Sequence, residues 1–378
     1  MKANDLKELR ISNLTAKLPI IQGGMGVGIS LSGLASAVAN QGCIGVIAAT
    51  GIGMLEDDYS THWPEANVRA LRREIRKARG LTKGILGINI MVAASNYEDM
   101  VKTAVEEGID IIFSGGGLPL NLPHFLKGAR KTKLVPIVSS GRAANIISKK
   151  WTEKYDYLPD AMVVEGPLAG GHLGFKVEQI GDAGYSLEKL VPEVIKAVKP
   201  FEARYKKSIP VIAAGGIYTG EDMYKFMQLG ASGVQLATRF VATHECDASV
   251  EFKRAYIDSS REDIVIINSP VGMPGRAIRN KFIDDVNSGE KKPFNCPYHC
   301  IRTCDYKSSP YCIALALRNA QNGSLEHGFA FAGENAYRTT RIISVKELVD
   351  SLTEEYEIAS KRAVSHNPGP AGSACDQG

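Results

Sequence analysis

The sequence predicts an α/β fold, a (β/α)8 or TIM barrel, with a smaller region appended to it. Three observations predict this fold. The chain has 378 residues, 44% of them apolar, which suffices for a barrel of about 250 residues and an appendage. Eight short apolar runs bounded by glycine, serine or proline recur along it, as expected of parallel strands covered on both faces. A stretch long enough for a crossover helix follows each run.

The eight runs define the predicted strands. In chain order they are residues 19–25, 43–50, 85–92, 110–116, 134–140, 161–167, 210–216 and 233–240. The connections after the second and sixth runs, 51–84 and 168–209, are longer than the others. We expect them to place extra loops or helices at the mouth of the barrel.

Helix-capping residues support these units. Ser95 or Asn96 can cap a helix over 97–107 that ends before Gly108. Thr219 similarly precedes a helix over 220–229.

We divide the chain into a barrel over 1–260, an appendage over 261–365 and a disordered tail over 366–378. Residues 245–263 look helical, 264–342 look irregular and rich in cysteine, and 344–365 read as a closing helix. The tail is rich in Pro, Gly and Ser.

Composition excludes several classes of protein. The net charge is +4 without a long basic run, so we expect no nucleic-acid partner. Seven cysteines, an odd number, without a secretory leader argue against a disulfide scaffold. The longest apolar stretches are far shorter than the roughly 20 residues that span a bilayer. We therefore expect a cytoplasmic protein without a membrane partner, either monomeric or a homodimer.

The predicted strands end in glycine and small polar residues, at the barrel face where active sites lie. Glycine lets a ligand approach the backbone, although any one of these glycines could simply make a tight turn. Seven such ends together favour a large flat ligand. The ends of the last two strands, with Gly215, Gly216 and Thr238, match the phosphate site of such barrels.

One histidine has a setting that suggests chemistry. His172 lies between glycines just beyond the sixth run, in the sequence EGPLAGGHLG. A lone histidine is more often a core or surface residue, but at this face its imidazole suits general acid-base work.

Five ordered motifs, PIIQGGMGVG, GINIMV, AGGHLG, AAGGI and QLATRF, resemble the nitronate monooxygenase family, formerly called 2-nitropropane dioxygenases. The related flavin-dependent enoyl-acyl-carrier-protein reductases share them. The resemblance covers about residues 15–280 and implies an FMN-binding TIM barrel. It assigns His172 as the catalytic base, and it assigns FMN contacts to Gly24, Met25, Asn89, Glu165, Gly170, Gly215, Gly216, Gln235, Leu236, Ala237 and Thr238. The family often has Gln at Glu165, Gly at Ala237 and a polar residue at Leu168.

Four cysteines form a separate cluster of unassigned role. Cys296, Cys300, Cys304 and Cys312 have a C-x3-C-x3-C-x7-C spacing that is compatible with zinc or an iron-sulfur centre but matches none of the commonest patterns. If the segment is helical, the first three share a face, which also suits plain packing. Both interpretations stay open.

The resemblance favours an FMN-dependent nitronate monooxygenase, which converts a small nitronate or nitroalkane and O2 into a carbonyl compound and nitrite. The alternative is an FMN-dependent reductase of enoyl-acyl-carrier-protein thioesters, or another flavin reductase, that uses NAD(P)H. A third hypothesis is a protein that binds a flavin or a phosphorylated ligand without turnover. Reduction of the flavin by one of these compounds would separate the three, since the protein supplies orientation and the flavin supplies the redox chemistry.

Overall fold

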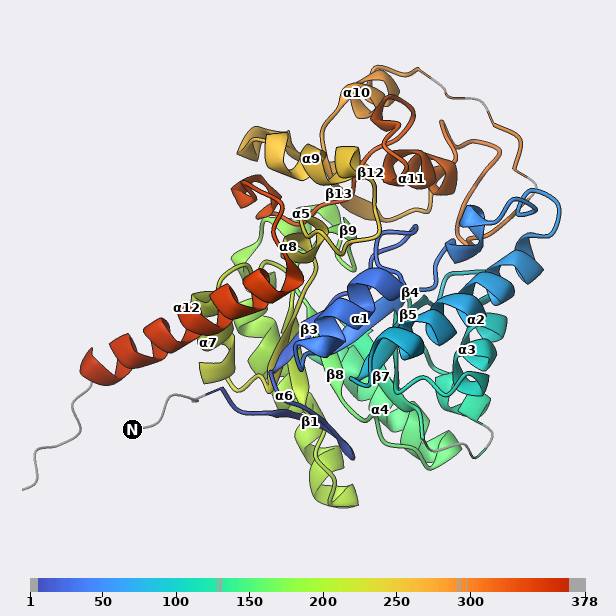
Figure 1. The fold of residues 1–378 in the computed structure, drawn as a ribbon. Helices are drawn as coiled ribbons and strands as arrows, with labels where there is room; N and C mark the ends of the chain where they lie inside the picture. The colour runs from blue at the N-terminus through green and yellow to red at the C-terminus, as the bar shows by residue number, and fades with distance from the viewer. Residues whose placement is uncertain are drawn as a thin grey trace, which may run out of the picture.

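The structure is a computed structural model that describes residues 6–366 except 127, 129, 130, 291, 293 and 297. Its largest sheet has eight parallel strands (Figure 1). They are β3 (Ile20–Gln22), β4 (Gly45–Ala48), β5 (Leu86–Met91), β6 (Ile111–Gly115), β7 (Lys133–Val138), β8 (Met162–Glu165), β10 (Val211–Ala214) and β11 (Gly233–Leu236). Ile44 N donates to Ile20 O and Gln22 N donates to Ile44 O, both at 3.0 Å, so the sheet closes between β3 and β4. Each predicted run overlaps one strand, which confirms the TIM barrel.

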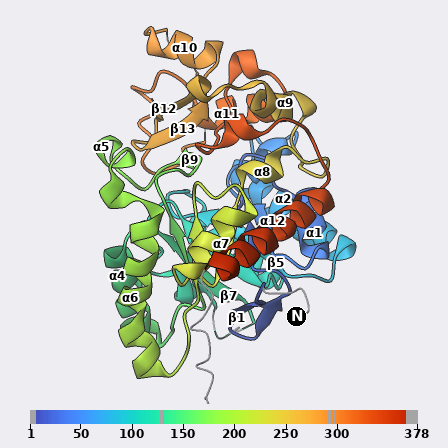
Figure 2. The same ribbon diagram turned by 90° about the vertical axis from the view of Figure 1, so that its left-hand side faces the viewer.

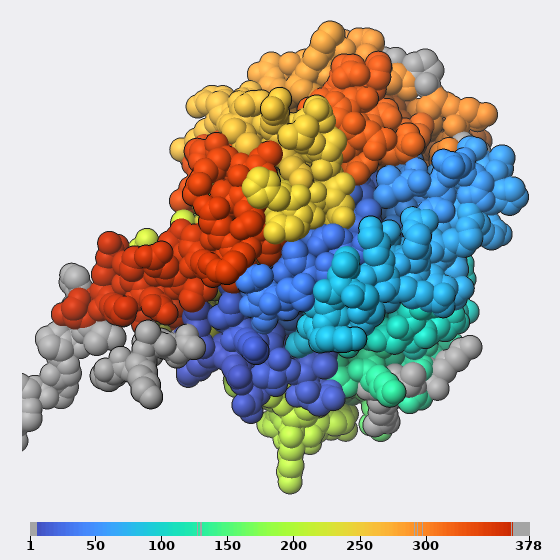
Figure 3. Space-filling view, in the orientation of Figure 1, coloured from blue at the N-terminus to red at the C-terminus, as the bar shows by residue number. Residues whose placement is uncertain are grey.

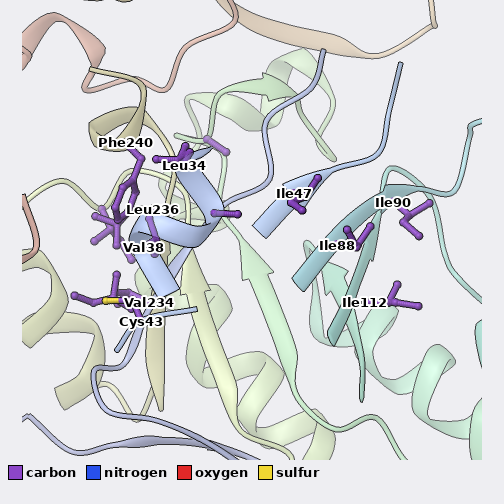
Figure 4. Packing of buried hydrophobic residues seen from close by; sticks show 14 of the residues in the cluster. Leu34, Val38, Cys43, Ile47, Ile88, Ile90, Ile112, Val234, Leu236 and Phe240 are labelled. Atoms are coloured by element: carbon purple, nitrogen blue, oxygen red, sulfur yellow. The ribbon is translucent and has the colours of Figure 1, made fainter. Parts of the chain in front are cut away.

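Helices cover the outside of this barrel. They are α1 (Ser32–Asn40), α2 (Trp63–Leu81), α3 (Tyr97–Glu106), α4 (Gly141–Tyr155), α6 (Leu187–Tyr205), α7 (Gly220–Gln228), the short α8 (Thr238–Val241) and α12 (Val345–His366). After β6 the described chain forms a short 3-10 helix, η2 (Leu122–Leu126), in place of an α-helix. Figure 4 shows Leu34 and Val38 of α1 beside Leu236 and Phe240, within the large apolar cluster between helices and strands.

The two predicted helix caps have different outcomes. Thr219 accepts a hydrogen bond from Asp222 N at 3.1 Å, and α7 ends before Gly230, whose φ of +98° suits glycine, so this prediction is confirmed. The helix predicted over 97–107 is confirmed as α3, which ends before Gly108, whose φ is +67°, but the predicted cap of this helix is wrong, because the Asn96 side chain makes no capping bond. The Ser95 hydroxyl donates instead to the carbonyl oxygen of His299, since a distant segment competes for it.

The N-terminal segment closes the bottom of the barrel. Strands β1 (Leu9–Ile11) and β2 (Leu14–Ala16) form an antiparallel hairpin. Leu9 and Ile11 pack with residues inside the barrel, among them Phe113 and Val163. The barrel therefore opens at the opposite end, where the carboxyl ends of its strands lie.

A region after the barrel strands covers that opposite end, where Figure 3 shows it as a yellow-to-orange mass. It contains α9 (Val250–Asp258), β12 (Ile264–Asn268), β13 (Pro274–Ile278), α10 (Lys281–Asn287) and α11 (Ile313–Gln321). Strand β13 pairs with β12 and with β9 (Gly171–His172), which belongs to the loop after β8. The prediction of irregular structure over 264–342 is wrong at β12, β13, α10 and α11, because the apolar faces of these four elements are buried against one another. The helical prediction over 245–263 holds for α9 and for the 3-10 turn η4 (Arg261–Asp263).

The closing helix predicted over 344–365 is α12, which lies along α7 on the side of the barrel (Figure 2). The C-terminal end of the described chain thus supports the barrel itself, although the sequence groups it with the appendage. The predicted tail lies outside the described residues beyond His366. Across 6–366, apart from the six gaps, no helix is both long and apolar enough to cross a bilayer.

Candidate functional site

A cavity of about 320 Å³ opens at the carboxyl ends of the barrel strands, beneath the appendage. All twelve residues predicted for the site line it. They are Gly24, Met25, Asn89, Glu165, Gly170, His172, Gly215, Gly216, Gln235, Leu236, Ala237 and Thr238. The structure therefore brings together residues at the ends of five barrel strands, β3, β5, β8, β10 and β11, and one residue of β9, while the individual role of each residue stays a prediction.

Close packing of the backbone shapes the floor of the cavity. A Cβ added at Gly24 would lie 2.3 Å from the Cβ of Asn89, so a side chain at Gly24 would displace this predicted ring contact. Beneath it the buried Gln22 accepts from Val46 N at 2.9 Å and donates to Gly23 O. Sequence analysis missed Gln22, although it lies directly before the QGGMG glycines.

The loops after β10 and β11 form a cradle with free amides. Gly215 and Gly216 have φ of +89° and +92°, and a Cβ at Gly216 would lie 2.9 Å from that of Leu168. In the part of the chain that the structure describes, the amides of Gly216 and Thr238 donate no hydrogen bond. Free amides beside a hydroxyl are the donors that a phosphate group prefers, so this cradle fits the phosphate of FMN.

A segment that sequence analysis missed completes the cradle. Asn335 Nδ2 donates to Gly216 O at 2.7 Å, and Glu334 N donates to Leu168 O at 3.1 Å. A Cβ at Gly333 would lie 2.6 Å from the Thr238 hydroxyl oxygen. The glycine in the sequence AFAGENAYR was the available signal, but nothing in its spacing related Gly333 to Thr238, 95 positions earlier, or to Leu168.

His172 stands at the boundary between barrel and appendage. It pairs with Gly275 across β9 and β13, its Nε2 lies 2.7 Å from the Ser269 hydroxyl oxygen, and its ring packs edge-on to Phe331 at 4.9 Å between centroids. Burial lowers the pKa of His172 to about 4. At neutral pH the imidazole is uncharged and can accept a proton from a molecule in the cavity.

A buried arginine fixes the loop that leads to His172. Arg276 Nη1 donates to the carbonyl oxygens of Pro167 and Ala169 at 2.6 and 2.7 Å, and its Nε lies 2.9 Å from a Glu334 carboxylate oxygen. Each interaction satisfies a charge or carbonyl that would otherwise be buried without a partner. Arg276 thereby joins the β8–β9 loop, β13 and the cradle segment.

Glu165 contributes a carboxyl group at the end of β8. Its side chain makes no hydrogen bond or ion pair with another described residue, and burial raises its pKa to about 7. The carboxyl group therefore exchanges its proton near neutral pH, beside the predicted flavin contacts.

Apolar side chains form the roof of the cavity. They come from the appendage and from the region around α2, and they include Tyr59, Trp63, Val271, Ile301, Ile313, Leu317 and Phe331. Sequence analysis found none of them, because their only common property is their position in the folded chain. The roof favours a substrate with an apolar part.

The cysteine segment borders the same cavity through Cys300. Residues 294–312 are not helical where described, and Ser95 N donates to Cys300 O at 2.9 Å. Burial and the neighbouring thiols of Cys312, Cys296 and Cys304 raise the pKa of Cys300 to about 12. Among the described residues no three His, Cys, Asp or Glu side chains are placed to hold a metal ion.

Comparison with known proteins places this geometry among flavin-dependent oxidoreductases. A family model described as nitronate monooxygenase matches residues 7–355. A probable nitronate monooxygenase of Bacillus subtilis is 26% identical and covers 89% of this chain and 95% of its own length. A Mycobacterium tuberculosis protein named as a hydroxy-methyl-oxo-octahydro-indene-carboxyl-CoA dehydrogenase is 28% identical, over 72% of this chain and 66% of that protein. The structure of FabK from Thermotoga maritima is 28% identical with a TM-score of 0.71, and covers 92% of this chain and 95% of that one.

The raised pKa of Glu165 predicts a pH-dependent cost to stability. The folded protein holds this proton up to about pH 7 and the unfolded chain only to about 4.5, so the charge destabilises the folded state as pH rises through that interval. At pH 8 we expect Glu165→Gln to raise the unfolding free energy of flavin-free protein by up to roughly 3 kcal/mol, and at pH 4 to leave it unchanged. Urea unfolding measures both, with the exposed Glu262→Gln as control. An equal effect at the two pH values would contradict the assignment.

For the cysteine segment we expect metal-free protein. Elemental analysis after anaerobic purification should find neither zinc nor iron in stoichiometric amount, and Cys300→Ser should change stability by less than about 1 kcal/mol. Stoichiometric metal would show instead that the four thiols bind it. In that case Cys300→Ser should expose residues 290–315 to proteases, because metal binding would stabilise this loop-rich segment.

Proposed function

This chain belongs to the nitronate monooxygenase family, and from that premise we propose that it is an FMN-dependent enzyme that oxidises alkyl nitronates or nitroalkanes with O2 to carbonyl compounds and nitrite. One observation carries the proposal. A neutral imidazole, held by a hydroxyl group and an aromatic ring, lies in a cavity whose loops fit a flavin phosphate. Removal of a proton next to a nitro group needs an unprotonated ring nitrogen, and an uncharged imidazole provides one.

The cradle and the strand ends would hold FMN in this proposal. Gly215, Gly216 and Thr238 would bind its phosphate, Gln235 to Ala237 would lie along the ribityl chain, and Gly24, Met25, Asn89, Glu165 and Gly170 would contact the ring system. When bound, the flavin supplies the redox chemistry by accepting electrons from the substrate and passing them to O2.

The chain's own residues would bind the substrate and move its proton. The apolar roof holds the alkyl part and excludes water from the reacting end. His172 takes the α-proton of a neutral nitroalkane, and Ser269 fixes the plane of the imidazole. The loop anchored by Arg276 keeps His172 in place while the proton is transferred.

The roof also favours a second candidate, an FMN-dependent reductase of enoyl thioesters that uses NAD(P)H. An acyl chain would pack against the same apolar side chains, and both the FabK structure and the carboxyl-CoA dehydrogenase are similar to this chain. The barrel alone does not distinguish these reactions, because loops and roof decide the substrate.

One anaerobic experiment separates the two candidates. The purified yellow protein is mixed without oxygen with a nitronate, a nitroalkane, NADH or NADPH, and flavin absorbance is followed. Bleaching by nitronate alone supports the oxidase, and bleaching by a nicotinamide supports the reductase. If none of the four reduces the flavin, both catalytic proposals are wrong.

Flavin binding should depend on Gly216. A side chain at its positive φ would strain the backbone and meet Leu168, so Gly216→Leu should yield colourless, folded protein. FMN content per chain, by absorbance after denaturation, measures the loss. Leu229→Ala, on the exposed surface of the barrel, should keep full occupancy. Full flavin content in Gly216→Leu would disprove the cradle assignment.

The role of His172 predicts a difference between substrates. His172→Ala should lower kcat/KM for neutral nitroalkanes by about 10²- to 10⁴-fold, because their α-proton must be removed, and should retain much of the activity on preformed nitronates. Steady-state oxygen consumption with each substrate measures the two effects. Equal losses on both would mean that His172 positions the substrate and does not act as a base.

A further inference from the structure

A second hollow, of about 410 Å³, lies on the other side of the cradle loops from the cavity. Its lining comes from the β10–α7 loop, α8, the segment before α12 and α12 itself, which lie close together in Figure 2. Gly216 and Ile217 line the cavity, whereas the next two residues, Tyr218 and Thr219, line this hollow. The β10–α7 loop therefore borders both spaces.

We call this second hollow the arginine hollow, because two arginines in its lining pack against the same aromatic ring. The guanidinium carbons of Arg239 and Arg338 lie 4.8 and 4.4 Å from the centroid of the Tyr218 ring. Arg239 donates to neutral acceptors, the Tyr218 carbonyl oxygen at 3.0 Å and the Ser351 hydroxyl at 3.4 Å. Within the described residues, neither guanidinium forms an ion pair with a carboxylate.

The hollow has three further charged residues. Arg341 pairs with Glu347 at 2.6 Å, and the Glu355 carboxylate accepts from the backbone amide of Gly220 at 2.7 Å and keeps its charge. Three arginines and two glutamates thus line the arginine hollow, which leaves an excess of one positive charge and favours a bound anion. The planar fork of a guanidinium matches the oxygens of phosphate.

We propose that the arginine hollow binds a phosphate monoester carried by an extended ligand, at a site distinct from the FMN phosphate cradle. A monoester fits better than a diester, because it presents three terminal oxygens to the two guanidinium groups. Two kinds of ligand carry such a group at the end remote from their reacting atoms, NADPH with its 2′-phosphate and coenzyme A thioesters with their 3′-phosphate. The inference does not depend on which reaction the flavin performs.

Calorimetric titration of the FMN-loaded protein tests the site and identifies the ligand. Four probes form two matched pairs, NADPH against NADH and coenzyme A against dephospho-coenzyme A. In at least one pair we expect the compound with the extra phosphate monoester to have a Kd at least 10-fold lower than its partner. The pair that shows this difference identifies the ligand as NADPH or as a coenzyme A thioester. Arg338→Gln should abolish the discrimination, and Arg338→Lys, which keeps the charge without the fork, should retain part of it.

The control is Arg279→Gln, which removes an exposed arginine paired with Asp284 at 2.8 Å in the appendage. It should leave the discrimination intact, and FMN content and nitronate turnover should be normal in all variants, so failure here is distinguishable from failure of the proposed function. Weak binding of inorganic phosphate with no discrimination in either pair would mean an adventitious ion only and would overturn the proposal. Discrimination that survives Arg338→Gln, or that Arg279→Gln also abolishes, would overturn it as well.

Discussion

The buried guanidinium of Arg276 is the interaction on which the cavity depends. It comes from the appendage, binds two carbonyl oxygens of the β8–β9 loop and pairs with Glu334 beside the cradle. A loop with unsatisfied buried carbonyls would not hold one conformation, because each would carry a desolvation penalty. Through this side chain the barrel, the histidine loop and the cradle segment become a single rigid unit.

Burial acts in opposite directions on the pKa values of His172 and Glu165. It lowers the pKa of His172 to about 4 and raises that of Glu165 to about 7, since in both cases the charged form loses its hydration. Near neutral pH the cavity therefore holds an uncharged base and a carboxyl group close to its midpoint. Pairs of groups shifted apart in this way are typical of sites that move protons.

The appendage supplies most of the side chains that would select the substrate above the barrel. The strand ends and glycine loops suit a flavin, whereas most of the roof that would contact a substrate comes from the appendage, with Tyr59 and Trp63 added from the region around α2. Relatives that act on different molecules can keep the barrel and change this roof.

The sequence by itself determined the eight strands, the cap of α7, the cradle glycines and the position of His172. Each of these depends on a local pattern, such as a continuous apolar run, a capping box or a glycine with positive φ, and local patterns are readable without the fold. Only the tertiary structure brought Ser269 to His172 across 97 residues and Asn335 to Gly216 across 119. In the tertiary structure the Ser95 hydroxyl also donates to the carbonyl oxygen of His299 and caps no helix. Within 264–342, which the sequence predicts to be irregular, β12 and β13 form an antiparallel pair. Such contacts arise from packing between distant segments, and no single stretch of sequence contains the information that selects them.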